Sequence, residues 1–282
     1  MQLLIGDLRR AVKDKALWLA LFVLLGIVVL MALLFIMTES MIPEMLESGA
    51  FDDMIASGEL DPMALEFFKD PEMVKMAFGQ AILITPLGCL FLVLISAIGI
   101  SVFNGGDFTF NTIRNKIIAG NSRTKIYLAQ LCVNLVLFFI FFFATFCISL
   151  LLGTVFFTIT YFIQILKQLL LALPLYLSAV SIMTFVCQST KSRSLGIVIN
   201  VLLVVLLPSL LSILSGLFVG PVGIISEILE ANPYTMLDTV ALSNYTVALE
   251  PMNILKMMLV AVAYAAVSTT AGILLFKRTD IK

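Results

Sequence analysis

The chain has 282 residues, of which 61% are apolar and only 12% are charged, and its net charge is −1. A soluble domain averages about 45–50% apolar and about 25% charged residues, so this composition excludes a soluble or disordered protein and predicts a multi-span membrane protein. The chain contains no histidine, which excludes imidazole chemistry such as a Ser-His-Asp triad or a histidine metal site.

The first predicted element is an amphipathic, interfacial helix in residues 1–15. Its apolar face is expected to comprise Leu4, Ile5, Leu8, Ala11 and Val12. Its charged face is expected to comprise Asp7, Arg9, Arg10, Lys13 and Asp14. Two interpretations are open: an element that docks a partner protein, or a plain anchor at the membrane surface.

Six apolar runs follow, and each is long enough to cross a hydrocarbon core of about 30 Å, which needs about 20 helical residues. They are residues 16–37, 82–104, 126–153, 168–187, 195–219 and 255–276. The first run is longer than a signal-peptide core and is expected to remain as a span. The four cysteines, Cys89, Cys132, Cys147 and Cys187, lie in apolar runs and are predicted to be small buried residues.

The basic residues are unevenly distributed between the two sides that six spans define. Thirteen of the 17 fall on the side of the termini, and the exceptions are Lys69, Lys75, Lys167 and Lys256. The positive-inside rule then predicts a protein of the cell membrane with both termini in the cytoplasm.

The segment 38–81 carries ten acidic residues and two lysines. Asp61-Pro62 and Asp70-Pro71 each place a capping acid before a proline that suits a first helical turn. The helices would have apolar faces made of Met41, Met45, Met54, Met63, Phe67, Phe68 and Met73. A small folded exterior cap is therefore expected, and its acidic surface either attracts a cationic cargo or is simply solvated.

The apolar runs contain no Asp, Glu, Arg or His. Ion-coupled transporters need ionisable groups at membrane depth, although discontinuous helices can bind sodium through backbone carbonyls. The chain also lacks the G-x-x-x-x-G-K-[ST] phosphate loop. If the protein moves a substrate uphill, the energy is expected to come from a separate ATPase.

The segment 105–125 predicts a short helix on the cytoplasmic face. Phe110, Ile113 and Ile117 recur at helical spacing, Gly120 suits a helix stop, and Ser122 suits the cap of the next helix. The helix could transmit a partner's motion as a lever, or it could be an ordinary interfacial loop helix.

The run from Asp107 to Tyr127, DFTFNTIRNKIIAGNSRTKIY, resembles the first cytoplasmic loop of type-2 ATP-binding-cassette exporter permeases. Those loops place an acid, three residues and Gly-Thr-Ile before Gly-x-Ser-Arg and a tyrosine. The chain departs from that pattern at Asp107, Asn111 and Gln130, where Glu, Gly and Lys are usual. The tail 276–282 and the six-span layout with a large first exterior loop are also similar to that family.

The resemblance implies a single permease domain over residues 1–282, a second permease copy or paralogue, and two separate ATPase subunits that bind ATP and Mg²⁺. The implied ATPase-coupling residues are Asp107, Phe110, Thr112, Ile113, Arg114, Asn115, Ile117, Gly120, Ser122 and Arg123. The N-terminal helix is implied to contact the ATPase too, through Arg9, Arg10 and Lys13.

The resemblance further implies short exterior or re-entrant helices in residues 220–254, before the last span. It places a substrate path between protomers along the second and fifth spans, where the polar residues are Thr85, Ser96, Ser101, Asn200, Ser209, Ser212 and Ser215. Each hydroxyl could instead bond a carbonyl of its own helix, and Asn200 could simply join helices.

The leading prediction is therefore an all-α permease subunit, not an enzyme, that exports a hydrophobic or amphipathic peptide, lipid or drug. Its expected partners are the ATPases, a second permease and membrane lipid, with no nucleic acid and no metal site. The alternatives are a stand-alone carrier and a non-transporting sensor or immunity subunit.

Overall fold

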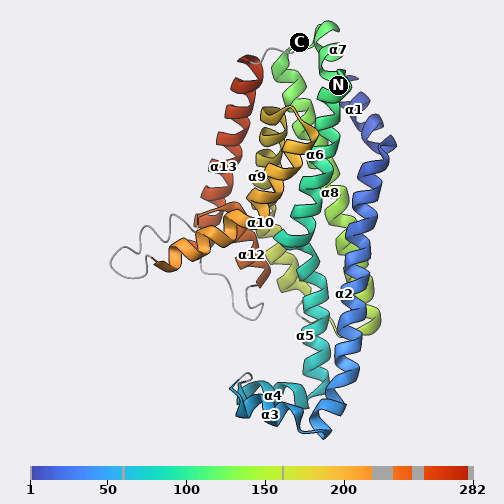
Figure 1. The fold of residues 1–282 in the computed structure, drawn as a ribbon, viewed down its shortest axis with the longest axis vertical. Helices are drawn as coiled ribbons and strands as arrows, with labels where there is room; N and C mark the ends of the chain where they lie inside the picture. The colour runs from blue at the N-terminus through green and yellow to red at the C-terminus, as the bar shows by residue number, and fades with distance from the viewer. Residues whose placement is uncertain (1, 59–60, 161, 218–230, 243–250, 279–282) are drawn as a thin grey trace.

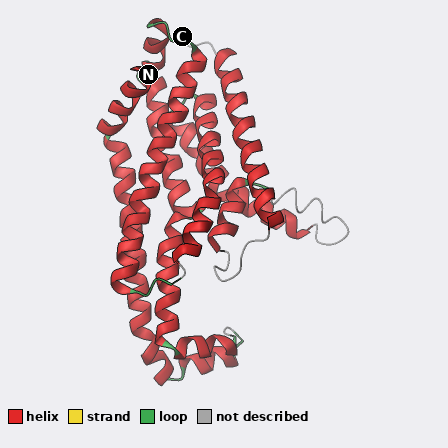
Figure 2. Cartoon of the chain, turned by 180° about the vertical axis from the view of Figure 1, so that it is seen from behind, coloured by secondary structure: helices red, strands yellow, loops and turns green. Residues whose placement is uncertain are grey.

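The computed structural model describes residues 2–58, 61–160, 162–217, 231–242 and 251–278. Within these ranges the chain is almost entirely helical and has no strand (Figure 2). Six helical segments are long and apolar enough to cross a membrane: Lys15–Glu47, Pro71–Thr109, Arg123–Phe156, Phe162–Thr190, Arg193–Leu211 and Asn253–Arg278. The predicted all-α, six-span fold is confirmed at this level.

The helices are α1 (Gln2–Lys13), α2 (Lys15–Glu47), α3 (Ala50–Ala56), α4 (Pro62–Lys69), α5 (Pro71–Ile84), α6 (Leu94–Thr109), α7 (Thr112–Ile118), α8 (Arg123–Phe156), α9 (Phe162–Thr190), α10 (Arg193–Leu217), α12 (Pro233–Leu242) and α13 (Pro251–Arg278). The molecule is elongated, with α1, α7 and the last turn of α13 at one end and α3 and α4 at the other (Figure 1). We call the first the basic end, because every described Lys and Arg except Lys69, Lys75, Lys167 and Lys256 belongs to the segments that meet there.

The first span is much longer than its apolar run. The 33 residues of α2 make a helix of about 50 Å at about 1.5 Å per residue, whereas the predicted span ended at residue 37. Composition located the apolar part of the helix. The polar residues that follow continue the helical backbone hydrogen bonds as far as Glu47. The ends of α2 and α5 therefore hold α3 and α4 away from the bundle (Figure 1).

These segments form an acidic arm, by which we mean the described part of residues 38–81. The arm has its own apolar core around Ile42, Phe51 and Val74, and the rings of Phe51 and Phe68 stack with centroids 4.9 Å apart. Asp70 caps α5 by accepting hydrogen bonds from the backbone N–H groups of residues 72 and 73. The described part of residues 38–81 thus contains short helices that share a small apolar core.

Two residues of its expected apolar faces are placed differently, since Met41 and Met73 are both more than half exposed. The side chain of Met63 lies outside the described residues.

The second span is interrupted between α5 and α6. A 3₁₀ turn at Thr85–Leu87 contains Pro86, and a π-helical segment at Cys89–Val93 follows. The break frees the carbonyl of Leu87, which accepts a 2.7 Å hydrogen bond from the buried hydroxyl of Tyr176 in α9. A non-helical backbone inside a membrane protein needs this kind of internal partner, because lipid supplies none.

Replacing Tyr176 with phenylalanine is expected to lower the free energy of unfolding by about 1–3 kcal/mol, because the Leu87 carbonyl would lose its hydroxyl donor. Thermal unfolding in detergent measures the change. Tyr264→Phe is the matched control, since Tyr264 is 40% exposed on α13, and its effect is expected within about 0.5 kcal/mol. Equal effects of the two substitutions would contradict a role for the Tyr176 hydroxyl at the break.

Other helix boundaries also differ from the predicted ones. The connection between α8 and α9 is residues 157–161 and not 154–167, because α9 already begins at Phe162. Before the last span, α12 begins at Pro233, where Asn232 accepts a hydrogen bond from the backbone N–H of Tyr234. Residues 220–230 and 243–250 of the segment 220–254 lie outside the described residues.

The prediction of buried cysteines was wrong for two of the four. Cys187 is buried, but Cys132 and Cys147 are exposed on the outside of the bundle. Apolar runs face lipid as readily as protein, so the sequence does not distinguish the two locations. The side chain of Cys89 lies outside the described residues.

Candidate functional site

Four charged side chains meet inside the basic end: Asp7 and Arg10 of α1, Asp107 of α6 and Lys116 of α7. The Asp107 carboxylate is completely buried; it pairs with Arg10, and one of its oxygens lies 3.3 Å from Lys116 Nζ. Lys116 Nζ also lies 2.8 Å from a carboxylate oxygen of Asp7. We call these four residues the charge cluster.

Two amides extend the charge cluster to two further helices. Gln130 of α8 donates a 2.5 Å hydrogen bond to Asp107, and Gln188 of α9 donates one to the Gln130 carbonyl oxygen. Five helices, α1, α6, α7, α8 and α9, are therefore joined by one polar network, although its members are far apart in the sequence.

The charges in the cluster balance, with two acids and two bases. Burial lowers the pKa of Lys116 below the usual value for lysine, against the opposing hydrogen bond and charge of Asp7. Burial likewise lowers the pKa of Arg10, with Asp7 and Asp14 opposing, and the guanidinium lies 4.3 Å from the ring centroid of Phe103. Because desolvating ions is expensive, such a cluster is stable only while every partner is present.

The charge cluster brings two charged residues of α1 into the bundle, although Leu4, Leu8 and Ala11 of the predicted apolar face pack there as expected. Asp7 is buried and Arg10 is half-buried, whereas Ile5 and Val12 of the predicted apolar face are exposed. The reason is tertiary: the partners of Asp7 and Arg10 lie in α6 and α7, about a hundred residues away. Arg9 and Lys13 are exposed.

The segment 105–125 forms the predicted short helix, α7, but with a different exposed face. Asp107 and Ile113, which we expected to contact a partner, are buried within the chain. Phe110 precedes the helix and is 70% exposed, and Ile118, which we did not single out, is 73% exposed. Arg114 and Asn115 are exposed between them. We call Phe110, Arg114, Asn115 and Ile118 the α7 tip.

Backbone geometry explains why Phe110 is not part of α7. Asn111 adopts a left-handed conformation with φ of 54°, so the chain turns between α6 and α7 and Phe110 leaves the register of Ile113 and Ile117. No local signal marked Ile118 as exposed, because two successive apolar residues of a helix can both be buried, as Phe141 and Phe142 of α8 are. Thr112 and Ile117 are half-buried.

The end of α7 and the start of α8 follow the predicted signals. Gly120 has φ of +85° just beyond α7, and the Ser122 hydroxyl accepts a hydrogen bond from the backbone N–H of Lys125. Arg123 donates to the carbonyls of Phe276 and Lys277 at 3.3 and 2.9 Å. Arg123 therefore ties α8 to the end of α13, a contact that the sequence did not indicate.

The residues of the expected substrate path do not share one surface of the chain. Ser96, Ser101 and Asn200 are buried, whereas Thr85 and Ser209 are exposed. Ser101 and Ser209 each donate to a carbonyl of their own helix, and Asn200 Nδ2 donates to Ser101 Oγ at 2.9 Å. The structure thus favours the helix-joining interpretation of Asn200. The side chains of Ser212 and Ser215 lie outside the described residues.

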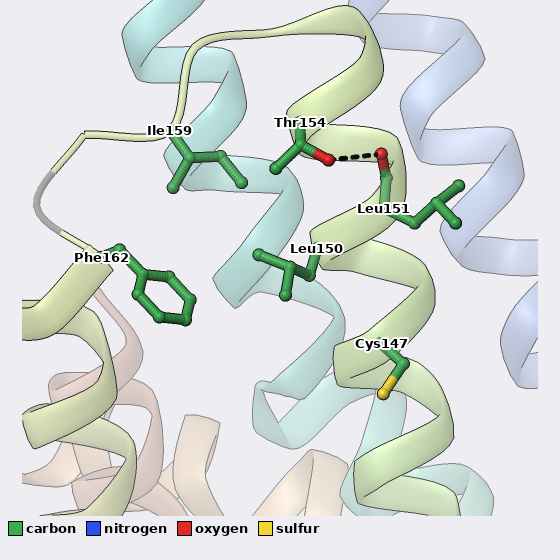
Figure 3. Close-up of a pocket in the computed structure, with 6 residues that line it drawn as sticks. All are labelled: Cys147, Leu150, Leu151, Thr154, Ile159 and Phe162. Atoms are coloured by element: carbon green, nitrogen blue, oxygen red, sulfur yellow. Dashed lines mark hydrogen bonds between the residues drawn. The ribbon is translucent and has the colours of Figure 1, made fainter.

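An apolar pocket of about 590 Å³ lies beside the connection of α8 and α9, away from these residues. It is lined by Cys147, Leu150, Leu151, Thr154, Ile159 and Phe162 (Figure 3). The hydroxyl of Thr154 already donates to the Leu151 carbonyl, so the pocket wall suits an apolar guest.

Comparisons with protein-family models, with curated proteins and with solved structures give no match to this chain. The fold itself defines a class, a multi-pass helical membrane protein. In the described part of the chain, no group of three His, Cys, Asp or Glu residues is arranged to hold a metal ion.

Proposed function

We propose that the chain is the permease subunit of an ATP-binding-cassette exporter in the cell membrane, with its basic end and both termini in the cytoplasm. Two separate ATPase subunits bind ATP and Mg²⁺, and their hydrolysis drives a hydrophobic or amphipathic substrate out of the cell. The observation that carries the proposal is the α7 tip, an exposed apolar and cationic surface at the basic end, held in place by the buried charge cluster.

The α7 tip has the composition of a docking surface. Phe110 and Ile118 are largely exposed and flank an exposed arginine, and aromatic and arginine side chains are typical anchors of protein interfaces. An ATPase that covers the tip would remove this apolar surface from water.

The charge cluster gives the tip a mechanical connection to the spans. Lys116 holds α7 to α1 and α6, and Gln130 and Gln188 continue the connection to α8 and α9. Separating buried ions is costly, so α7 moves together with the ends of these helices. A displacement of the tip by an ATPase is therefore passed to several spans at once.

The outer faces of the spans support the remaining partners. Large apolar side chains are exposed along α2, α10 and α13, for example Phe22, Leu206 and Val262. These faces are available to membrane lipid and to a second permease copy or paralogue. The apolar runs of the spans contain no acid for ion coupling, which favours energy from a partner.

Replacing Ile118 with aspartate is expected to abolish docking, because interface anchors contribute about 2 kcal/mol or more and a buried carboxylate adds a desolvation cost. The measurement is co-purification with a Walker-motif ATPase expressed together with this chain, followed by substrate-stimulated ATP hydrolysis in liposomes. The control is Met73→Asp, since Met73 is 51% exposed at the opposite end and is expected to leave both readouts unchanged.

Unaltered co-purification and stimulation with Ile118→Asp would remove the support for the coupling role. ATP-independent uptake by the chain alone would favour a stand-alone carrier. Failure of the wild-type chain to bind or stimulate the ATPase would favour a non-transporting subunit.

A further inference from the structure

Four buried amide side chains lie on the bundle side of the charge cluster, one each from α6, α8, α9 and α10. They are Asn104, Asn134, Gln188 and Asn200, and each is at most 3% exposed. Within the described residues, the side-chain oxygens of all four have no hydrogen-bond partner, whereas the Asn104 amide also hydrogen-bonds the Cys187 thiol. We call these four residues the amide site.

The hydrogen bonds of the Asn134 and Asn200 amide nitrogens show that the four amides lie in one region. Asn134 Nδ2 donates to Thr184 Oγ1 at 2.9 Å, one turn of α9 from Gln188. Asn200 Nδ2 lies 3.4 Å from Cys187 Sγ, next to Gln188 in the sequence, and 2.9 Å from Ser101 Oγ. Asn104 is one turn of α6 from Ser101. The helices α6, α8, α9 and α10 therefore enclose a polar region around one segment of α9.

Unsatisfied amides at this depth are unfavourable. A buried polar atom without a partner costs about 1–3 kcal/mol, and surrounding lipid supplies no hydrogen bonds. Native proteins satisfy such groups in the great majority of cases, and ordered water that makes two to four hydrogen bonds is the usual partner. Four unsatisfied oxygens within one region point to a bound hydrogen-bonding ligand.

The chemistry of the amide site indicates which ligand this is. All four side chains are neutral, so the amide site offers no charge to an ion. All four unsatisfied atoms are acceptor oxygens, which need a donor. A water molecule donates two hydrogen bonds and accepts others, which matches this set. We propose that the amide site binds ordered water and forms a hydrated interior next to the charge cluster. The inference does not depend on the exporter function.

Radiolytic hydroxyl-radical labelling of the full chain in lipid nanodiscs tests the proposal, because radicals formed from a bound water oxidise side chains that bulk solvent does not reach. Cys187 is 1% exposed and contacts Asn200. Met257 is an internal reference, since it is 8% exposed but packs in the apolar core. Oxidation of Cys187 several-fold faster than that of Met257 is expected once each rate is divided by the rate of the same residue in the unfolded chain. Equal or slower oxidation in the wild-type protein would overturn the proposal without any variant.

Asn104→Leu supplies a second readout. If water bridges the amides, the substitution removes its hydrogen bonds, slows oxidation of Cys187 and lowers the melting temperature. A higher melting temperature would overturn the proposal, because it would mean that an unsatisfied amide had been removed. Thr270→Val is the control, since this exposed hydroxyl bonds its own helix and its loss is expected to change neither measurement. The labelling is also compared in buffers that contain choline or sodium as the cation. A lower rate of Cys187 oxidation in sodium would overturn the proposal in favour of a bound cation.

Discussion

Replacing Asp107 with asparagine is expected to lower the free energy of unfolding by about 3–5 kcal/mol, since removing one member of a buried ion pair leaves its partners uncompensated. Asp107 is fully buried and pairs with both Arg10 and Lys116, so the variant would retain two desolvated bases with only Asp7 between them. Thermal or denaturant unfolding in detergent measures the loss.

The matched control is Asp52→Asn, an exposed acid of the acidic arm, which is expected to change stability by no more than about 0.5 kcal/mol. A double-mutant cycle with Lys116→Met tests the cluster itself. Because both residues belong to one network, the two effects are expected to be less than additive. Additive effects, or an Asp107 variant as stable as the Asp52 variant, would contradict a cooperative charge cluster.

Replacing Gly105 with alanine is expected to destabilise the contact between α6 and α10 by about 1–3 kcal/mol or more, as overpacking of a filled interior does. A Cβ atom at residue 105 would lie 2.5 Å from the Cα of Arg193 and 2.9 Å from its Cβ. The obstacle is backbone, so it cannot rotate away, and the two helices must separate. Unfolding in detergent measures this change as well.

Gly26→Ala is the control, and its expected effect on stability has the opposite sign. Gly26 lies within the α2 span, and a Cβ atom added there would have nothing within 4 Å, so alanine is expected to stabilise the helix by about 0.5–1 kcal/mol. A Gly105 variant as stable as the Gly26 variant would show that α6 and α10 are not closely packed at Arg193.

The sequence by itself determined the features that depend on composition and on neighbouring residues. Apolar runs of sufficient length require helices that satisfy their own backbone in lipid, so six spans could be predicted. The segregation of bases to one end followed from their positions between spans. Asp70, Gly120 and Ser122 acted as predicted, because a cap or a helix stop is made within a few residues of the chain.

Only the tertiary structure decided which side chains face inward. Asp7 and Arg10 turn into the bundle because their partners are on α6 and α7, and no local pattern reports a partner about a hundred residues away. In a membrane protein an apolar residue suits lipid and core alike, so Cys147 and Ile118 could not be placed from periodicity. For the same reason, the hydrophobic pattern that identified the spans could not specify how the spans pack against one another. Their packing depends on the few polar contacts and close glycine approaches between them.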